Sequence, residues 1–206
     1  MSSRVSTLAG GAGNSSDYHA IEFGRTWVLI AALVVTSLAH AHEAMGASFT
    51  PSTVFVQAGA GDEQTQAYVL GATWDLPWKA EFSYGSVSAY FEVAFGRWTT
   101  RAHGTSTAWP TQMSLTPVVR LHPSGVAHLW FAEVGVGANY IVPVFESGDK
   151  RFSTEFNFGD HAAVGRQFGE QGQLEVSLRV EHFSNGGISR PNPGENFVQL
   201  RLAHTF

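Results

Sequence analysis

The sequence predicts an all-β protein, and more narrowly an eight-stranded antiparallel transmembrane β-barrel. The clearest observation is segment 174–184, in which aliphatic residues alternate with polar and charged ones. Successive side chains of a strand point to opposite faces, so one face is aliphatic until it ends in His182 and Ser184. The other face carries Glu175 and Arg179. Such a strand fits a barrel whose apolar side meets lipid and whose charged side lines the lumen.

The second observation is that this period of two recurs along the chain between turn residues. The predicted strands are segments 54–60, 68–74, 87–95, 113–121, 130–140, 156–168, 174–184 and 198–206. In the sixth, Asp160 and Arg166 interrupt either choice of apolar face, and we expect a β-bulge there. Roughly eight strands of about ten residues suit a small membrane barrel. A soluble β-sandwich or lipocalin-like barrel is the alternative.

The composition excludes several classes of function. The 206 residues include 22 Gly, 13% aromatic and only 14% charged residues, which suits one domain of many strands and tight turns. The formal net charge is -5 and no basic stripe occurs, which argues against a nucleic-acid partner. The lack of cysteine excludes disulfides and thiolate metal sites. The histidines lack metal-ligand spacing, so we expect no metal and no cofactor.

We interpret residues 1–41 as a secretory signal peptide with an over-extended N-terminus. Arg25 precedes the apolar stretch 27–38, and Ala39-His40-Ala41 supplies an A-x-A cleavage pattern. The apolar stretch is shorter than the roughly 20 residues of a spanning helix. We therefore expect cleavage after Ala41 and a mature barrel domain over residues 42–206.

The chain ends on Phe206, in the apolar parity of its last strand. A terminal aromatic strand resembles the signal that the barrel-insertion machinery of Gram-negative bacteria reads. We therefore expect the cell outer membrane as the location, with its lipids and that machinery as partners and a homodimer as a further candidate assembly. With both termini in the periplasm, the seventh strand would carry His182 and Ser184 toward the cell exterior.

The inward parity predicts a polar lumen, and the strand ends predict aromatic girdles. The expected lumenal ion network consists of the charged residues Glu92, Arg120, Glu133, Glu175, Arg179, Glu181 and Arg201. The expected girdle residues are Trp74, Trp98, Trp130 and Tyr140. We expect His161 to join the lumen.

His182 and Ser184 form the candidate catalytic pair. Serine is a poor nucleophile until a base removes its proton, and histidine is the usual base. At positions i and i+2 of a strand the two side chains share a face, with about 7 Å between their Cα atoms. Glu195 begins the returning strand and is the candidate third member, which would orient the imidazole. The expected donors to an oxyanion are supplied by Asn185, Gly186, Gly187 and Asn192.

The stretch 179–196, RVEHFSNGGISRPNPGEN, resembles the lipid A 3-O-deacylase (PagL) family through its His-x-Ser-Asn and the following Pro-Asn. The resemblance implies an eight-stranded barrel that hydrolyses the ester at the 3 position of lipid A. It implies His182 as base, Ser184 as nucleophile and Glu195 as the acid of the triad, and no metal. One departure is that Glu195 follows Gly194 directly, whereas the family pattern has a residue between them. Alternation also places Glu195 on the inward face.

These observations predict an outer-membrane serine esterase acting on lipid A within lipopolysaccharide. Its Ser/His/Glu triad would lie on the lipid-facing surface, where polar side chains are costly unless they serve a function. An outer-membrane phospholipase is the nearest enzymatic alternative. A non-catalytic barrel for adhesion or envelope stability is the alternative from another class.

Overall fold

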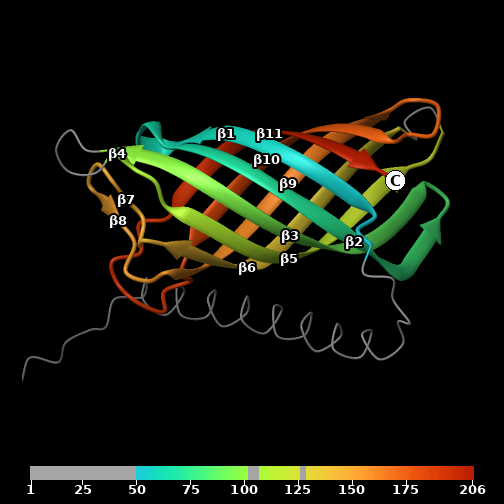
Figure 1. The fold of residues 1–206 in the computed structure, drawn as a ribbon. Coiled ribbons are helices and arrows are strands. Elements are labelled where there is room, and N and C mark those ends of the chain that lie inside the picture. Colours follow the sequence, from blue (N-terminus) through green and yellow to red (C-terminus); the bar gives the residue numbers. More distant parts are fainter. Residues whose placement is uncertain (1–49, 102–106, 126–128) are drawn as a thin grey trace, which may run out of the picture.

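The computed structural model describes residues 50–101, 107–125 and 129–206 (Figure 1). The predicted signal peptide lies outside these ranges. The elements are β1 (Thr53–Gly61), the 3-10 turn η1 (Asp62–Gln64), β2 (Gln66–Phe82), β3 (Gly85–Arg101), β4 (Thr107–Ala108), β5 (Thr111–Pro123), β6 (Trp130–Val142), β7 (Glu146–Ser147), β8 (Lys150–Arg151), β9 (Phe156–Phe168), β10 (Leu174–Ser184) and β11 (Glu195–Thr205). Within the described ranges, no helix combines the length and apolar character needed to cross a membrane.

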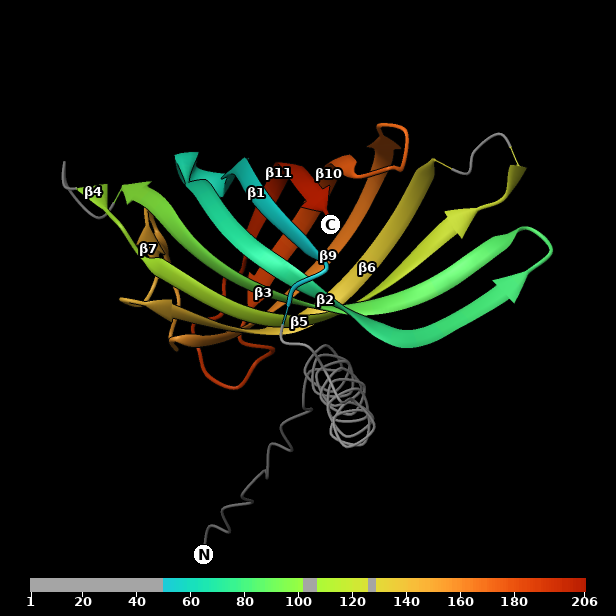
Figure 2. The ribbon, with the colours of Figure 1, turned by 45° about the vertical axis from the view of Figure 1, so that its right-hand side comes forward.

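The long strands close into an eight-stranded antiparallel barrel, which confirms the predicted fold class. Around the ring the order is β1, β2, β3, β5, β6, β9, β10 and β11, and β11 pairs with β1. Figure 2 shows the sheet curving round until β1 lies beside β11. Each predicted segment corresponds to one of these strands, because the period of two is set by the pleat itself.

The two ends of the barrel differ. At one end the first strand meets the last, with Thr53 opposite Thr205. The other end gathers the η1 turn, the β7–β8 hairpin and the loop 185–194 between β10 and β11. In Figure 1 the β7–β8 hairpin and the C-terminus mark these opposite ends. The end of β10 that carries Ser184 is the end remote from the termini.

The predicted bulge in β9 is wrong. Its pairing with β10 runs without a register shift from Phe168 opposite Leu174 to Phe158 opposite Ser184. Asp160 and Arg166 keep the outward parity of a regular strand. Arg166 is stabilised there by its guanidinium, which lies 5.8 Å from the ring centre of Trp130 and 5.1 Å from that of Phe168. The break instead occurs in β2, where the register shifts between Asp75 and Lys79.

The middle of the barrel holds the predicted ion network. Arg120 pairs with Glu133 and Glu175, each at 2.8 Å. Arg179 pairs with Glu92 at 2.9 Å and with Glu133 at 3.2 Å, and Arg201 also pairs with Glu92. Glu181 instead accepts a hydrogen bond from Gln199. Because these charges are buried, each depends on its partners, and removing one would leave the others uncompensated.

An aromatic plug fills the barrel interior beside the loop 185–194. Its buried members are Ala67, Trp98, Ile141, Phe145, Phe152, Phe183 and Phe197. The Trp98 ring lies 4.9 Å from Phe183 and 4.8 Å from Phe197. The prediction that Trp98 belongs to an aromatic girdle is therefore wrong. Trp98 shares the inward parity of Glu92 on β3 and is 0% exposed.

Candidate active site

His182 and Ser184 lie on the outer wall at the end of β10, both half-buried, while Phe183 between them points inward. Phe183 is fixed in the plug by its contacts with Trp98 and Phe197. Because β10 alternates regularly, anchoring Phe183 inside holds its two neighbours outside on one face. The predicted catalytic pair is thus placed on the surface that faces lipid in a membrane barrel.

The partner of His182 across the β10–β11 pair is Asn196. Its Oδ1 lies 2.7 Å from Nδ1 of His182, and its Nδ2 donates a hydrogen bond to Oδ2 of Asp62 at 3.1 Å. Asp62 in turn forms an ion pair with Lys150 at 2.7 Å. Three segments distant in sequence, η1, β8 and the start of β11, therefore meet beside the candidate base.

The structure does not bring Glu195 to His182. Its side chain points into the barrel and is 0% exposed, and Oε2 accepts a hydrogen bond from Lys150 at 3.1 Å. The cause is strand parity: Glu195 is register partner of the inward Phe183, whereas the next residue, Asn196, faces outward opposite His182. The residue that contacts Nδ1 is thus one position beyond the predicted acid.

Asn185 and Asn192 hold the loop that follows Ser184. The buried Asn185 amide donates to the hydroxyl of Ser153 and to the carbonyl oxygen of Ser189, both at 2.9 Å. Asn192 Oδ1 accepts the backbone N–H of Asn185 at 3.0 Å. The amide donor of Asn185 is therefore engaged in shaping the loop, whereas Asn192 holds the loop through its acceptor Oδ1.

The backbone donors of the two glycines differ. The N–H of Gly187 donates to Oδ1 of Asn185 at 2.9 Å. The N–H of Gly186 has no acceptor among the described residues, and it lies two residues after Ser184. Of the two glycines, Gly186 is therefore the one whose backbone donor remains available.

Gly194 forms a close wall against the imidazole. A Cβ atom at this position would lie 2.7 Å from Cε1 and 3.3 Å from Nε2 of His182. Its φ of +70° also belongs to the left-handed region that favours glycine. Only glycine lets the backbone pass this near to the ring without displacing it.

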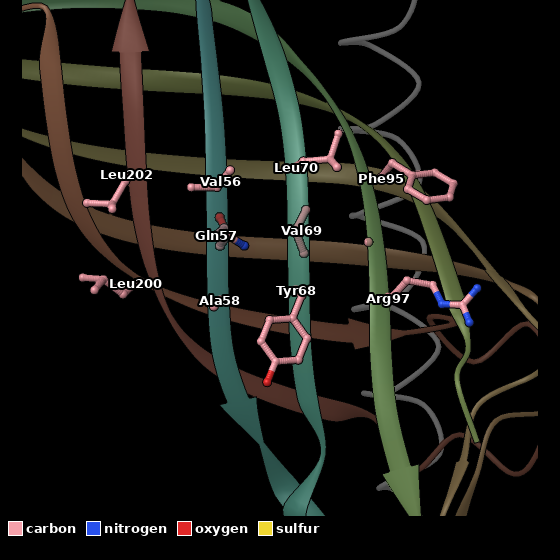
Figure 3. Close-up of a pocket in the computed structure, with 11 residues that line it drawn as sticks. Val56, Gln57, Ala58, Tyr68, Val69, Leu70, Phe95, Arg97, Leu200 and Leu202 are labelled. Atoms are coloured by element: carbon pink, nitrogen blue, oxygen red, sulfur yellow. The ribbon is translucent and has the colours of Figure 1, made fainter. Parts of the chain in front are cut away.

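An open groove of about 510 Å³ lies on the outer wall formed by β1, β2, β3 and β11 (Figure 3). Its lining is almost entirely apolar and includes Val56, Leu70 and Leu200, with Arg97 at one side. Leu200 has the same outward parity on β11 as Asn196. The groove therefore lies on the same wall as the candidate site.

Sequence reasoning missed Asn196, Asp62, Lys150 and Asp160. Asp160 is the register partner of His182 on the β9 side and faces outward. A regular strand without the expected bulge would have placed Asp160 outward, and the inward parity of Glu195 implies that Asn196 faces outward, but only the register shows that both flank His182. Across residues 50–101, 107–125 and 129–206, no group of three or more His, Cys, Asp or Glu side chains is arranged to hold a metal.

Fold and site together define a membrane β-barrel with a serine–histidine pair on its outer wall. Residues 66–205 match the model of the family described as lipid A 3-O-deacylase (PagL), and the chain belongs to this family. As the family relationship implies, it is an acyl-ester hydrolase located in the outer membrane of Gram-negative bacteria.

Two curated relatives support the assignment. The chain is 30% identical over 178 residues to the lipid A deacylase PagL of Bordetella bronchiseptica, covering 84% of this chain and 93% of the relative. It is 29% identical over 172 residues to the protein of the same name from Pseudomonas aeruginosa, covering 81% and 91%. The crystal structure of the outer membrane enzyme PagL superposes with a TM-score of 0.65 at 25% identity, covering 75% of this chain and 99% of that one.

Proposed function

We propose that this barrel hydrolyses the ester-linked acyl chain at the 3 position of lipid A, with Ser184 as nucleophile and His182 as general base. The observation that carries the proposal is that both side chains share the outward face of β10, at the end remote from the termini. Family membership supports the choice of substrate. With the termini in the periplasm, this end of the wall faces the outer leaflet, where lipid A resides.

The first half-reaction forms an acyl-enzyme. Ser184 Oγ attacks the ester carbonyl carbon while Nε2 of His182 takes the hydroxyl proton. When the tetrahedral intermediate collapses, the bond to the sugar oxygen breaks and His182 returns the proton to that oxygen. The Gly186 N–H is our candidate donor to the oxyanion, because it is the free backbone donor next to the nucleophile.

The second half-reaction releases the fatty acid. His182 takes a proton from water, whose oxygen attacks the acyl carbon, and the bond to Ser184 Oγ then breaks as the proton passes to that oxygen. In this scheme Glu195 acts at a distance: its carboxylate binds Lys150, which also binds Asp62. It supports the arrangement of charges rather than touching the imidazole.

The lipid-facing position removes the need for an enclosed substrate pocket. The substrate already lies in the leaflet beside the strand, and the apolar groove across β11, β1 and β2 offers a surface for its remaining acyl chains. Burial of methylene groups against such a surface positions the ester relative to Ser184.

Mass spectrometry of lipid A from cells that produce the barrel tests the proposal. The wild-type chain should remove one 3-linked acyl chain, and Ser184→Ala and His182→Ala should not. Ser189→Ala is the matched control, because only its backbone oxygen is used in the loop. If Ser184→Ala removes the same chain as the wild type, or if phospholipids lose acyl chains instead, the proposal fails.

A further inference from the structure

We infer that Asn196, oriented by Asp62, is the positioning residue for His182, in the place where a directly contacting carboxylate was expected. The inference rests on the proposed roles of His182 and Ser184. It is carried by two contacts: Asn196 Oδ1 lies 2.7 Å from Nδ1 of His182, and its Nδ2 lies 3.1 Å from Asp62 Oδ2.

The Asp62 contact determines which end of the amide faces the imidazole. An ionised carboxylate only accepts hydrogen bonds, so the amide NH₂ of Asn196 must point to Asp62. Its carbonyl oxygen then points to His182 and accepts a hydrogen bond, which requires the proton on Nδ1. Nε2 is left as the acceptor, which is the state a general base needs toward Ser184.

Asp62 also supplies the negative charge that Asn196 lacks. When His182 takes the serine proton, the amide dipole and the Asp62 carboxylate behind it both favour the imidazolium. Lys150 holds Asp62 at 2.7 Å and the buried Glu195 at 3.1 Å. Lys150 lies on the hairpin between β6 and β9, and its two ion pairs connect this hairpin to the η1 turn and to the start of β11.

Two other carboxylates are less suited to this role. Glu195 points into the barrel, on the opposite face of β11 from Asn196. Asp160 faces outward beside His182, but within the described residues it forms no hydrogen bond or ion pair with the imidazole. Asn196 is the group in contact with Nδ1.

Four variants of the full barrel in detergent test the inference, with fatty acid release from purified lipopolysaccharide as the readout. Asn196→Ala should lower kcat by on the order of 100-fold with little change in KM, because it removes orientation rather than substrate contact. Asp62→Ala should lower kcat by about tenfold. Asn196→Asp should retain most of the activity, since a carboxylate also accepts from Nδ1.

The decisive variant combines Asn196→Asp with Asp62→Ala. In this background the loss of Asp62 should no longer lower the rate, because no amide remains to be oriented and a repulsion between carboxylates disappears. A merely structural role for Asp62 would cost the same in both backgrounds. Asp149→Ala is the matched control on the β7–β8 hairpin and should behave like the wild type, since its side chain is exposed.

The inference is overturned if Asn196→Ala reacts at the wild-type rate, or if Asp62→Ala is equally costly in both backgrounds. It is also overturned if Asp160→Asn abolishes the reaction while Asn196→Ala does not. If Asn196→Ala does not fold, the two Asp62→Ala comparisons still decide. Continued release by Ser184→Ala would refute the proposed function itself, whereas an inactive Ser184→Ala with a fully active Asn196→Ala refutes this inference alone.

Discussion

The Nδ1 atom of His182 lies 2.7 Å from Oδ1 of Asn196, directly across the β10–β11 pair. This contact joins the end of β10 to the first residue of β11 that faces the outer wall. Their chain neighbours Phe183 and Glu195 form the next register pair, and both point into the barrel. The site therefore depends on the same register that builds the barrel wall.

Gly194→Ala should lower kcat by about tenfold to 100-fold. The new methyl group would approach Cε1 of His182 to 2.7 Å, which forces the ring or the loop to move. Gly172→Ala is the control, because its φ of +71° imposes similar backbone strain while its nearest neighbour is Gln167 at 3.5 Å. Fatty acid release from both variants measures the difference. Equal activities would show that the close approach of Gly194 does not position His182.

Arg179→Met should destabilise the barrel by about 3–5 kcal/mol, because Glu92 and Glu133 lose a shared buried partner. Arg151→Met provides the comparison and should change the stability little. The Arg151 side chain is 71% exposed, and its ion pair with Glu146 is long, at 4.0 Å. Urea unfolding in lipid vesicles reports both free energies. An Arg179→Met barrel as stable as the wild type would mean that the network does not depend on this residue.

Much of this fold follows from the alternation of apolar and polar residues along the sequence. Every predicted strand is present because alternation depends only on the pleat and on which side meets lipid. The same parity places the lumenal charges correctly, and it also places Trp98 inside, because Trp98 is an even number of residues from Glu92 on the same strand. Asp160 suggested a bulge because a charge on the outer wall looks like a broken pattern, although the strand is regular.

The candidate site was only partly predictable. His182 and Ser184 are two residues apart, so a local rule places them together. Asn196, Asp62 and Lys150 come from three segments, and their meeting depends on the β10–β11 register and on how the β7–β8 hairpin folds back. No local pattern specifies that approach, so the sequence alone favours the acidic Glu195 over its neighbour Asn196.

Phe183→Ala should destabilise the barrel by about 3–5 kcal/mol and should also reduce activity at temperatures where the barrel is still folded. The phenyl ring packs at 4.9 Å from Trp98, and its loss frees the strand end that carries both catalytic candidates. Phe82→Ala serves as the control, because Phe82 is exposed on the β2–β3 hairpin and stacks on Tyr84. Thermal unfolding and ester hydrolysis are measured on the same samples. Loss of stability with full activity would show that the plug does not position His182 and Ser184.

The ion pair between Asp62 and Lys150 predicts a shift in the pH at which the Asp62 carboxylate is protonated. The hydrogen bond from Lys150, with that from Asn196, lowers the pKa of Asp62 below its ordinary value. Burial would lower the pKa of Lys150, but its hydrogen bonds to Asp62 and Glu195 raise it above its ordinary value. The contribution of Asp62 is thus lost only as the pH falls through its lowered pKa, and that of Lys150 only as the pH rises through its raised pKa.

Lys150→Met combined with Glu195→Gln removes the cation without leaving a buried carboxylate unpartnered. The groups that remain around Asp62 are Asn196 and, beyond it, His182. The pKa of Asp62 should then rise toward its ordinary value, above its pKa in Glu195→Gln alone. Carbon NMR of the Asp62 carboxyl over a series of acid pH values measures this pKa in both variants. Because only the Lys150 substitution changes the charge that faces Asp62, superimposable titration curves would show that this ion pair does not lower the pKa of Asp62.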